Sequence, residues 1–361
     1  MFERRLYYHI DWVLIGSVFA ICAIGLTMIY STTGGPSRVY LTQMYAVALG
    51  LVAMGICLMF DYRSLADKSH WFYIGVVGLL IGVLVFGAVR GGSRRWIDLG
   101  MVNLQPSEFA KAALALVLAK LFGESRRTSI GHSEFVIAAA FTALPLVLIA
   151  RQPDLGTAVT LLPILIVTAY LADYPMKVLA ILALIAVLAA PLAYKFGLED
   201  YQRERISTFL DPTQDPRGAG YQQIQAKITV GSGGAWGKGF MEGTQGQLRF
   251  LPVAHNDFIF SVLAEEQGFL GVLVALGLYL FVIVRSLEAA RGAKDRLGSY
   301  LVLGVLASFT FQVIYNITMS AGLAPVKGLT LPLMSYGGSS MIATLAGFGL
   351  ILNVRMRRFT N

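Results

Sequence analysis

Long apolar runs recur along the entire chain, and short polar segments separate them. A helix of about 20 apolar residues crosses a hydrocarbon core about 30 Å thick, and it satisfies its own backbone hydrogen bonds without water. The pattern therefore predicts an all-α, polytopic membrane protein with about ten transmembrane helices in a single membrane domain, residues 1–361. The predicted spans are 12–30, 41–60, 71–89, 105–123, 134–150, 155–172, 176–194, 258–284, 299–321 and 338–354.

The first run could also be a secretory signal, because it follows Arg4 and Arg5. It is longer than the apolar core of such a signal, and 31–34 has no small-residue cleavage pattern. We interpret it as a retained helix. Cys22 and Cys57 both fall inside predicted spans, where a disulfide is not expected.

The basic residues are divided unevenly between the two sets of loops. Only 14% of the 361 residues are charged, yet the net charge is +8. An even number of spans places both termini on one side, and that side carries Arg4, Arg5, Arg63, Lys68, Arg126, Arg127, Lys177, Arg285, Arg291, Lys294, Arg296, Arg355, Arg357 and Arg358. The positive-inside rule then predicts cytoplasmic termini. Because membrane topology accounts for the positive charge, no nucleic-acid partner is expected.

Residues 195–257 form a long polar, glycine-rich segment, which the same parity places outside the cell between the seventh and eighth helices. A loop of this length is usually functional or disordered. Here Tyr221, Ile224, Ile228 and Val230 alternate with polar residues in a short amphipathic pattern, which favours order. We expect it to lie along the membrane surface as a lid or half of a cavity. The chain has no internal repeat, which argues weakly against a transporter.

Charged residues within spans are the first candidates for chemistry, since intramembrane charge is expensive unless it is paired or lines a polar cavity. Glu108 and Lys111 lie three residues apart, so a helix places them on one face as a candidate ion pair. The pair can pin this helix to a neighbour, and it can also border a substrate cavity. These two interpretations are compatible.

Asp257 lies where the outer loop meets a long apolar helix. It can be a simple helix N-cap, or a partly desolvated carboxylate with a raised pKa that acts as a general base. Glu265 is expected to line the same cavity, and Glu266 to point elsewhere. His255 is more often an ordinary loop histidine.

The glycine-rich segment 231–239 does not match the phosphate-binding P-loop pattern, because position 232 is Ser and Gly follows Lys238. Its backbone could still hold a diphosphate near Lys238, although a set of tight turns explains the glycines as well. The predicted outer face carries many cations, which an anionic substrate would explain: Arg94 and Arg95 before Trp96, and Arg151, Arg203, Arg205, Lys238, Arg249 and Lys327.

Taken in order, these segments resemble the SEDS family of membrane proteins over essentially the whole chain, its rod-shape (RodA) branch more than its division (FtsW) branch. The matching motifs are Arg94–Ile97, Gln105–Glu108, Gln152–Thr157, Phe209–Pro212, Gly218–Gln222, Gly231–Gly234, Gly237–Gly239, Gly243–Gln245, His255–Phe258 and Leu331–Ser340. The family usually has Glu and Arg after Leu251-Pro252 and Thr before the aspartate, where this chain has Val253, Ala254 and Asn256. Lys327 and Thr330 are more similar to the division branch.

The resemblance implies a glycosyltransferase of the bacterial cytoplasmic membrane that polymerises lipid II, the undecaprenyl-diphosphate-linked disaccharide pentapeptide, during cell elongation and maintenance of rod shape. It implies that Asp257 is the essential base of an inverting reaction and that Glu108 and Lys111 are functionally sensitive. Arg94, Arg95, Trp96, Arg205, Lys238, Glu265, Ser335 and Ser339 are candidate diphosphate or substrate contacts. The resemblance specifies no cofactor, and a divalent cation, Mg²⁺ or Mn²⁺, is compatible with this chemistry.

The partners implied are a class B penicillin-binding transpeptidase and other elongation-complex proteins. We expect the transpeptidase to dock on the last helix, where Leu345, Phe348 and Leu352 recur at helical spacing beside small residues. The alternative is that these residues pack within the bundle or face lipid. Two other functions remain open, a lipid II flippase and a scaffold that only recruits a partner, but the long outer loop and the charged residues favour the polymerase.

Overall fold

The computed structural model describes residues 9–90, 93–98, 103–125, 129–197, 199–215, 218–248 and 250–359. Arg4, Arg5, Arg126, Arg127 and Arg249, which entered the charge arguments above, lie outside these ranges.

Helices occupy every predicted span. They are α1 (Trp12–Thr32), α2 (Arg38–Met59), α4 (Ser69–Phe86), α5 (Pro106–Gly123), α6 (His132–Ala150), α7 (Leu155–Val159) with α8 (Leu162–Leu171), α9 (Met176–Leu192), α13 (Ile259–Arg291), α14 (Arg296–Ser320) and α15 (Gly338–Met356). Among the described residues, seven helices are long and apolar enough to cross a membrane: α1, α2, α4, α6, α13, α14 and α15. That α5, which carries three charged residues, crosses the membrane therefore stays a prediction. The same holds for the shorter apolar helices α7, α8 and α9.

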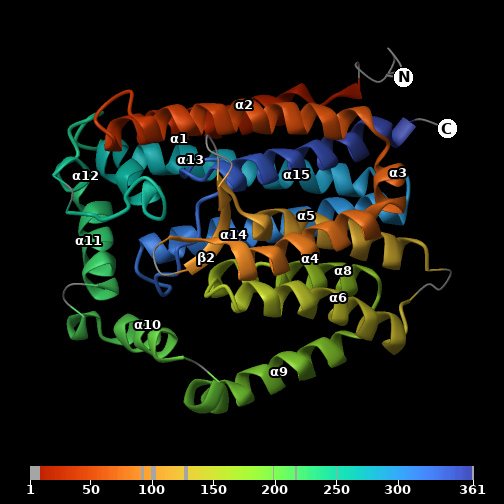
Figure 1. Ribbon diagram of the computed structural model, residues 1–361. Helices are drawn as coiled ribbons and strands as arrows, with labels where there is room; N and C mark the ends of the chain where they lie inside the picture. The colour runs from red at the N-terminus through yellow and green to blue at the C-terminus, as the bar shows by residue number, and fades with distance from the viewer. Residues whose placement is uncertain are drawn as a thin grey trace.

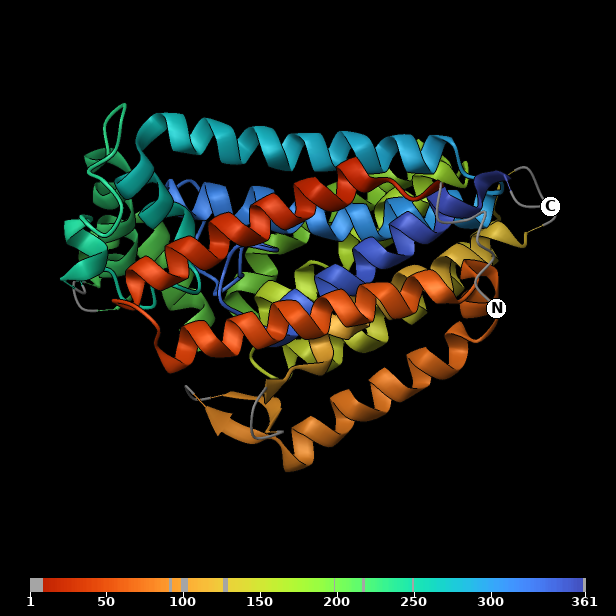
Figure 2. The same cartoon turned by 90° about the horizontal axis from the view of Figure 1, so that it is seen from above.

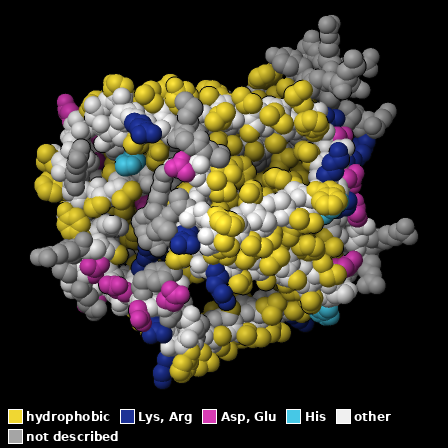
Figure 3. Space-filling model, viewed as in Figure 1, with side chains coloured by type: hydrophobic (Ala, Val, Ile, Leu, Met, Phe, Trp, Pro, Cys, Tyr) yellow, Lys and Arg dark blue, Asp and Glu magenta, His cyan; other side chains and the backbone are white. Residues whose placement is uncertain are grey.

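The long helices run side by side as a bundle, and both termini lie at one end of it (Figures 1 and 2). The other end carries α10 (Asp200–Leu210), α11 (Ala219–Ser232) and α12 (Thr244–Gln247), so the predicted outer segment contains regular structure in its described parts. Apolar side chains cover the middle of the visible face, and charged side chains gather toward the two ends (Figure 3). This surface is the one expected of a bundle in a bilayer.

The expectation of an all-α fold needs correction, because three short strands connect α4 to α5. β1 (Ala88–Arg90), β2 (Ser93–Asp98) and β3 (Asn103–Leu104) form an antiparallel sheet in that order. The sequence around Gly91-Gly92 is of a kind that favours a two-residue hairpin connection. The predicted span 71–89 consequently ends early, at Phe86, and the sheet carries Arg95 and Trp96.

The segment with the amphipathic pattern forms a helix, α11, but its isoleucines do not lie on the buried face of that helix. Gln223, Ala226 and Thr229 are buried, whereas Ile224 and Ile228 are exposed. The reason is close packing on α13: a Cβ at Gly233 would lie 1.9 Å from the carbonyl oxygen of Ala264. Small and polar residues therefore face the bundle, and the isoleucines face outward.

The last helix, α15, is buried and packs along α2. Leu345, Phe348 and Leu352 are at most 2% exposed, so the predicted docking surface for a transpeptidase is wrong. The glycines of this helix serve packing inside the bundle, since a Cβ at Gly349 would lie 2.8 Å from the backbone oxygen of Met54. By contrast, α9 has no buried residue and lies apart from the other long helices.

Candidate active site

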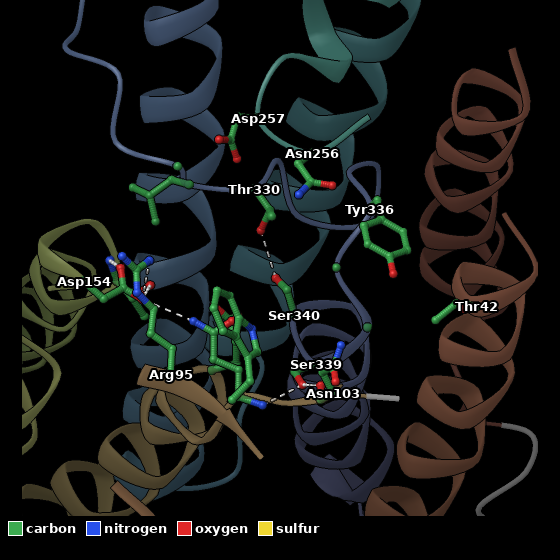
Figure 4. A pocket seen from close by; sticks show the side chains of 18 residues that line it. Thr42, Arg95, Asn103, Asp154, Asn256, Asp257, Thr330, Tyr336, Ser339 and Ser340 are labelled. Atoms are coloured by element: carbon green, nitrogen blue, oxygen red, sulfur yellow. Dashed lines mark hydrogen bonds and ion pairs between the residues drawn. The ribbon is translucent and has the colours of Figure 1, made fainter. Parts of the chain in front are cut away.

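A cavity of about 320 Å³ contains Asp257, the candidate general base, and we therefore call it the catalytic cavity; its lining residues lie at the end of the bundle away from the termini. The starts of α2, α5, α7, α13 and α15 converge there with the sheet. In Figure 4, Asp257 lies at one end of the cavity, Arg95 and Asp154 lie on one side, and Tyr336 and Thr42 lie on the other. Segments that are distant in sequence thus supply a single polar chamber.

Asp257 lies in a tight turn just before α13 rather than within the helix. Its backbone N–H and that of Asn256 both donate to the carbonyl oxygen of Val253, at 3.3 and 3.0 Å. Val253 itself has φ +54°, an unusual conformation for a β-branched residue that marks local strain. Among the described residues, no side chain donates a hydrogen bond to the Asp257 carboxylate. The carboxylate is therefore free to accept a proton from a substrate.

Asn316, on α14, holds this turn in place. Its Nδ2 donates to the carbonyl oxygens of Asp257, at 2.9 Å, and Leu329, at 2.6 Å. One buried amide thus links the turn of Asp257 to the loop that crosses the cavity wall. Sequence reasoning missed Asn316, although an amide in a largely apolar span, like Gln312 one turn earlier, is a signal of function or structure.

We expect Asn316→Ala to destabilise the protein by about 1–3 kcal/mol, because two buried carbonyl oxygens lose their donor. Activity should fall even though Asp257 remains. Ser308→Ala on the same helix is the matched control: the Ser308 Oγ is buried without a partner among the described residues, so its removal should cost little. Thermal unfolding and activity of both variants check this, and equal behaviour of the two would contradict the positioning role.

Burial raises the pKa of Asp257 to about 6. The charges of Arg205 and Arg95 oppose this increase in pKa, and the carboxylate of Asp154 adds to it. A base with a pKa near the working pH combines a large deprotonated fraction with useful proton affinity. The predicted desolvated carboxylate is therefore present, and a pure N-cap role is excluded because the Asp257 side chain does not cap α13.

Arg95 and Asp154 form a second fixed unit of the cavity wall. Arg95 donates to the carbonyl oxygens of Gln152, at 3.2 Å, and Pro153, at 2.7 Å, and its Nη1 lies 3.6 Å from Asp154 Oδ2. Asp154 also caps α7 through Thr157. Sequence reasoning missed Asp154 as a site residue, because the arginine that it faces is 59 positions earlier in the sequence.

Glu108 and Lys111 form the predicted ion pair, with the Nζ of Lys111 2.8 Å from Glu108 Oε2. The Nζ also donates to Gln312 Oε1 at 2.8 Å. Both charged side chains are buried, yet Glu108 also lines the catalytic cavity. The structural and the cavity interpretations of this pair therefore both hold.

Arg205 and Lys327 lack an ion-pair partner among the described residues, and the charge of Arg205 acts on both Asp257 and Lys327. Burial, together with the nearby charge of Arg205, lowers the pKa of Lys327. Two cations in proximity without a counterion favour an anionic ligand. Arg94, by contrast, is exposed and points toward α4, where its Nη1 lies 3.5 Å from the carbonyl oxygen of Val85.

Glu265 and Lys238 do not join the catalytic cavity, contrary to expectation. Glu265 is fully buried, and its Oε1 lies 2.6 Å from the Nζ of Lys238. The same carboxylate accepts from the backbone N–H of Gln245, so it holds the glycine-rich loop against α13. The sequence could not reveal this partner because Lys238 lies in a loop 27 positions before Glu265, and no local pattern predicts how that loop packs on α13.

The glycine-rich segment likewise does not form a diphosphate cradle. The backbone N–H groups of Lys238 and Gly239 donate to the carbonyl oxygens of Glu265 and Glu266, at 2.9 and 3.0 Å. A Cβ at Gly237 would lie 2.1 Å from the Glu266 oxygen. The glycines are therefore required for close packing on α13, as the interpretation as tight turns predicts.

The two candidate serines differ in their roles. Ser339 lines the catalytic cavity, where its Oγ donates to the carbonyl oxygen of Asn103 and accepts from the backbone N–H of Gln105. Ser335 is buried away from the cavity, and its Oγ accepts from the backbone N–H of Leu331. Ser335 therefore shapes the loop, while Ser339 fastens the sheet to α15.

Comparisons with known proteins agree with this architecture. The cell cycle protein family FTSW_RODA_SPOVE matches residues 5–359. The chain is 36% identical to the peptidoglycan glycosyltransferase MrdB of Escherichia coli K12, over 97% of this chain and 94% of MrdB, and 31% identical to the peptidoglycan glycosyltransferase RodA of Treponema pallidum, over 96% and 98%. Proteins named FtsW also match.

A solved chain from a peptidoglycan synthase complex that coordinates polymerization and crosslinking superposes with a TM-score of 0.85, at 34% identity, over 98% of this chain and 99% of that one. The predicted membership is confirmed by sequence and by structure over nearly the full length. This chain belongs to the FtsW–RodA–SpoVE (SEDS) family of integral membrane proteins.

Proposed function

We propose that this chain is a peptidoglycan glycosyltransferase of the elongation type that polymerises lipid II, with Asp257 as the general base. The observation that carries the proposal is a partly buried carboxylate without a side-chain donor among the described residues, whose pKa is raised to about 6, in a cavity that Arg95 lines and where the charge of Arg205 also acts on the carboxylate. The relatives named as peptidoglycan glycosyltransferases support the reaction class.

The chemistry requires a single displacement. The donor sugar carries an α-linked diphosphate, and the product linkage is β, so attack from the opposite face with inversion suffices. Asp257 takes the proton from the acceptor 4-hydroxyl as the new C1–O4 bond forms and the bond from C1 to the diphosphate oxygen breaks. Because the diphosphate is a good leaving group, no acid partner is needed, whereas an inverting glycosidase requires a second carboxyl group to protonate its leaving oxygen.

Arg205 and Lys327 are the side chains placed to stabilise the departing diphosphate. Neither has an anionic partner among the described residues. The charge of Arg205 acts on both Asp257 and Lys327, and Lys327 directly precedes Gly328, which lines the catalytic cavity. Arg95 is less available, since two backbone carbonyls and Asp154 already engage it. Fixed cations aimed at developing negative charge are usually the largest catalytic contribution.

A divalent cation remains compatible with the reaction, but the described residues contain no group of three His, Cys, Asp or Glu that could hold one. No step of this mechanism is therefore assigned to a metal ion.

We further propose ten crossings of the bacterial cytoplasmic membrane, with both termini cytoplasmic and the catalytic cavity outside. The bundle end that carries the termini is rich in paired cations: Arg285 and Arg355 both contact Asp11, at 2.9 and 2.6 Å. Such a concentration of Arg is typical of the cytoplasmic side.

A crosslinking transpeptidase is the proposed partner, supported by the structural likeness to a synthase complex. Because α15 is buried, the docking surface lies on other helices. Co-purification with a class B penicillin-binding protein, followed by polymerisation with and without it, tests the assignment.

The pH dependence of the reaction follows from Asp257. The carboxylate must be deprotonated to act, and its pKa is about 6, so the rate should rise about tenfold between about pH 5 and about pH 7 and then level off. Initial rates of lipid II consumption across this range measure the effect. A flat profile would contradict a titrating base.

The decisive test of the proposed function is an assay of the purified full-length protein on lipid II. We expect glycan strands from the wild-type protein alone. Movement of lipid II across vesicle membranes without any polymer would instead favour the flippase function. If the protein shows neither activity, the scaffold function is the one that remains.

A further inference from the structure

A second cavity of about 460 Å³ lies beside the catalytic cavity, across the turn that carries Asp257. Its wall includes Thr33, Ser37, Val39, Gln247 and His255. It contrasts with the catalytic cavity, which is lined by Arg95, Glu108, Asp154 and Asp257. Among the described residues that line the second cavity, only His255 is titratable. The proposed mechanism gives this space no role.

The two cavities are adjacent along two separate elements. On α2, Val39 lines the second cavity and Thr42 the catalytic cavity, and residues three apart lie on the same helix face, about 4.5 Å along the axis. In the turn, His255 borders the second cavity and Asp257 the first. The rings of His255 and Tyr336 pack edge to face with centroids 5.6 Å apart, so they form the boundary between the two chambers.

The wall of the second cavity is held rigid by buried groups. The backbone N–H of Gly246 lies 3.4 Å from Glu265 Oε2, and the Nε2 of Gln247 donates to the carbonyl oxygen of Ser31 at 2.9 Å. Ser31 in turn donates to Glu266. The two buried glutamates thus fix the loop that faces the cavity, and a preformed wall lowers the ordering cost of binding.

We propose that the second cavity binds the neutral sugars of the growing glycan strand, beginning with the sugar next to the one that reacts in the catalytic cavity. This inference rests on the proposed polymerase function. Hydroxyl, amide and neutral imidazole groups beside aliphatic surface from Val39, Leu251 and Pro252 suit an N-acetylated polysaccharide. Both lipid-linked substrates carry a diphosphate, for which a chamber without Lys or Arg is a poor site. The cavity therefore retains the strand between additions.

The test fills the cavity and measures strand length. Val39→Trp should shorten the strands at least about fivefold, because faster strand release ends synthesis earlier, while the initial rate of lipid II consumption changes less than about twofold. Val52→Trp, on the exposed face of the same helix, is the matched control and should leave both unchanged. Unchanged strand length in a stably folded Val39→Trp protein would overturn the proposal. A fall in the initial rate of lipid II consumption as large as the fall in strand length would also overturn it.

A photo-crosslinking residue at position 39 provides a readout that needs no catalysis. We expect crosslinks to lipid-linked glycan oligomers prepared with another polymerase, and none to lipid II monomer in an Asp257→Asn background. Crosslinks to the monomer would overturn the assignment to the strand. If the wild-type protein makes no polymer, the proposed polymerase function fails, and crosslinking to the supplied oligomers still tests the cavity separately.

Discussion

Asp257→Asn should reduce lipid II polymerisation by about 10²–10⁴-fold, the usual contribution of a positioned general base. The amide keeps the shape of the side chain but cannot accept the proton from the acceptor hydroxyl. The turn itself should persist, since the bonds that hold it run through the backbone of Val253 and the amide of Asn316. Polymer yield from purified protein measures the effect.

Stability gives an independent check on the same variant. Because the folded-state pKa of Asp257 is raised to about 6, the carboxyl contributes stability that is fully present below its unfolded pKa and is lost as pH rises through about 6. At pH 7.5 the Asn variant should therefore unfold at the same or a higher temperature than the wild type. Asp200→Asn, an exposed carboxylate of the same outer segment, should alter neither property. Full activity in Asp257→Asn would refute the base assignment.

Lys111→Met should destabilise the protein by about 3–5 kcal/mol, because it leaves the Glu108 charge buried and unpaired. Both partners of this pair are buried, and the Nζ of Lys111 also satisfies Gln312. The double variant Glu108→Gln/Lys111→Met removes both charges and should recover most of the stability. It should not recover activity, because Glu108 lines the catalytic cavity. A charge-swapped pair should likewise recover stability better than activity.

The matched control for this pair lies on the same helix. Lys120 pairs with Asp67 at 3.3 Å near the surface, and exposed pairs contribute about 0–1 kcal/mol. Lys120→Met should therefore shift thermal unfolding far less than Lys111→Met. Equal shifts for the two variants, or a Lys111→Met protein with unchanged stability and activity, would discard the coupling.

The apolar runs were sufficient to locate the helices. The ends of α1, α5, α6 and α14 fall within a few residues of prediction, because the length of apolar chain and the demand for internal hydrogen bonds are local properties. The spacing of Glu108 and Lys111 likewise predicted their contact, since residues three apart on a helix are neighbours regardless of the fold. Asp257 was identified by its motif and its position at a loop–helix junction.

The faces of the helices could not be predicted in this way. Lipid tails are as apolar as a protein core, so hydrophobicity does not distinguish a lipid-facing side from a buried one. That is why Leu345, Phe348 and Leu352 were assigned to a partner surface although they are buried, and why the amphipathic pattern around Ile224 and Ile228 did not reveal which face of the helix is buried.

The site itself depends on contacts between distant segments. Arg95 meets Asp154, Asn316 supports Asp257, and Lys238 pairs with Glu265 rather than with substrate groups. By itself, the sequence determined the helices, the local ion pair and the carboxylate at the loop–helix junction, since each depends on neighbouring residues. Only the tertiary structure decided which of the other polar residues meet in the catalytic cavity, because that depends on how the ends of separate helices converge.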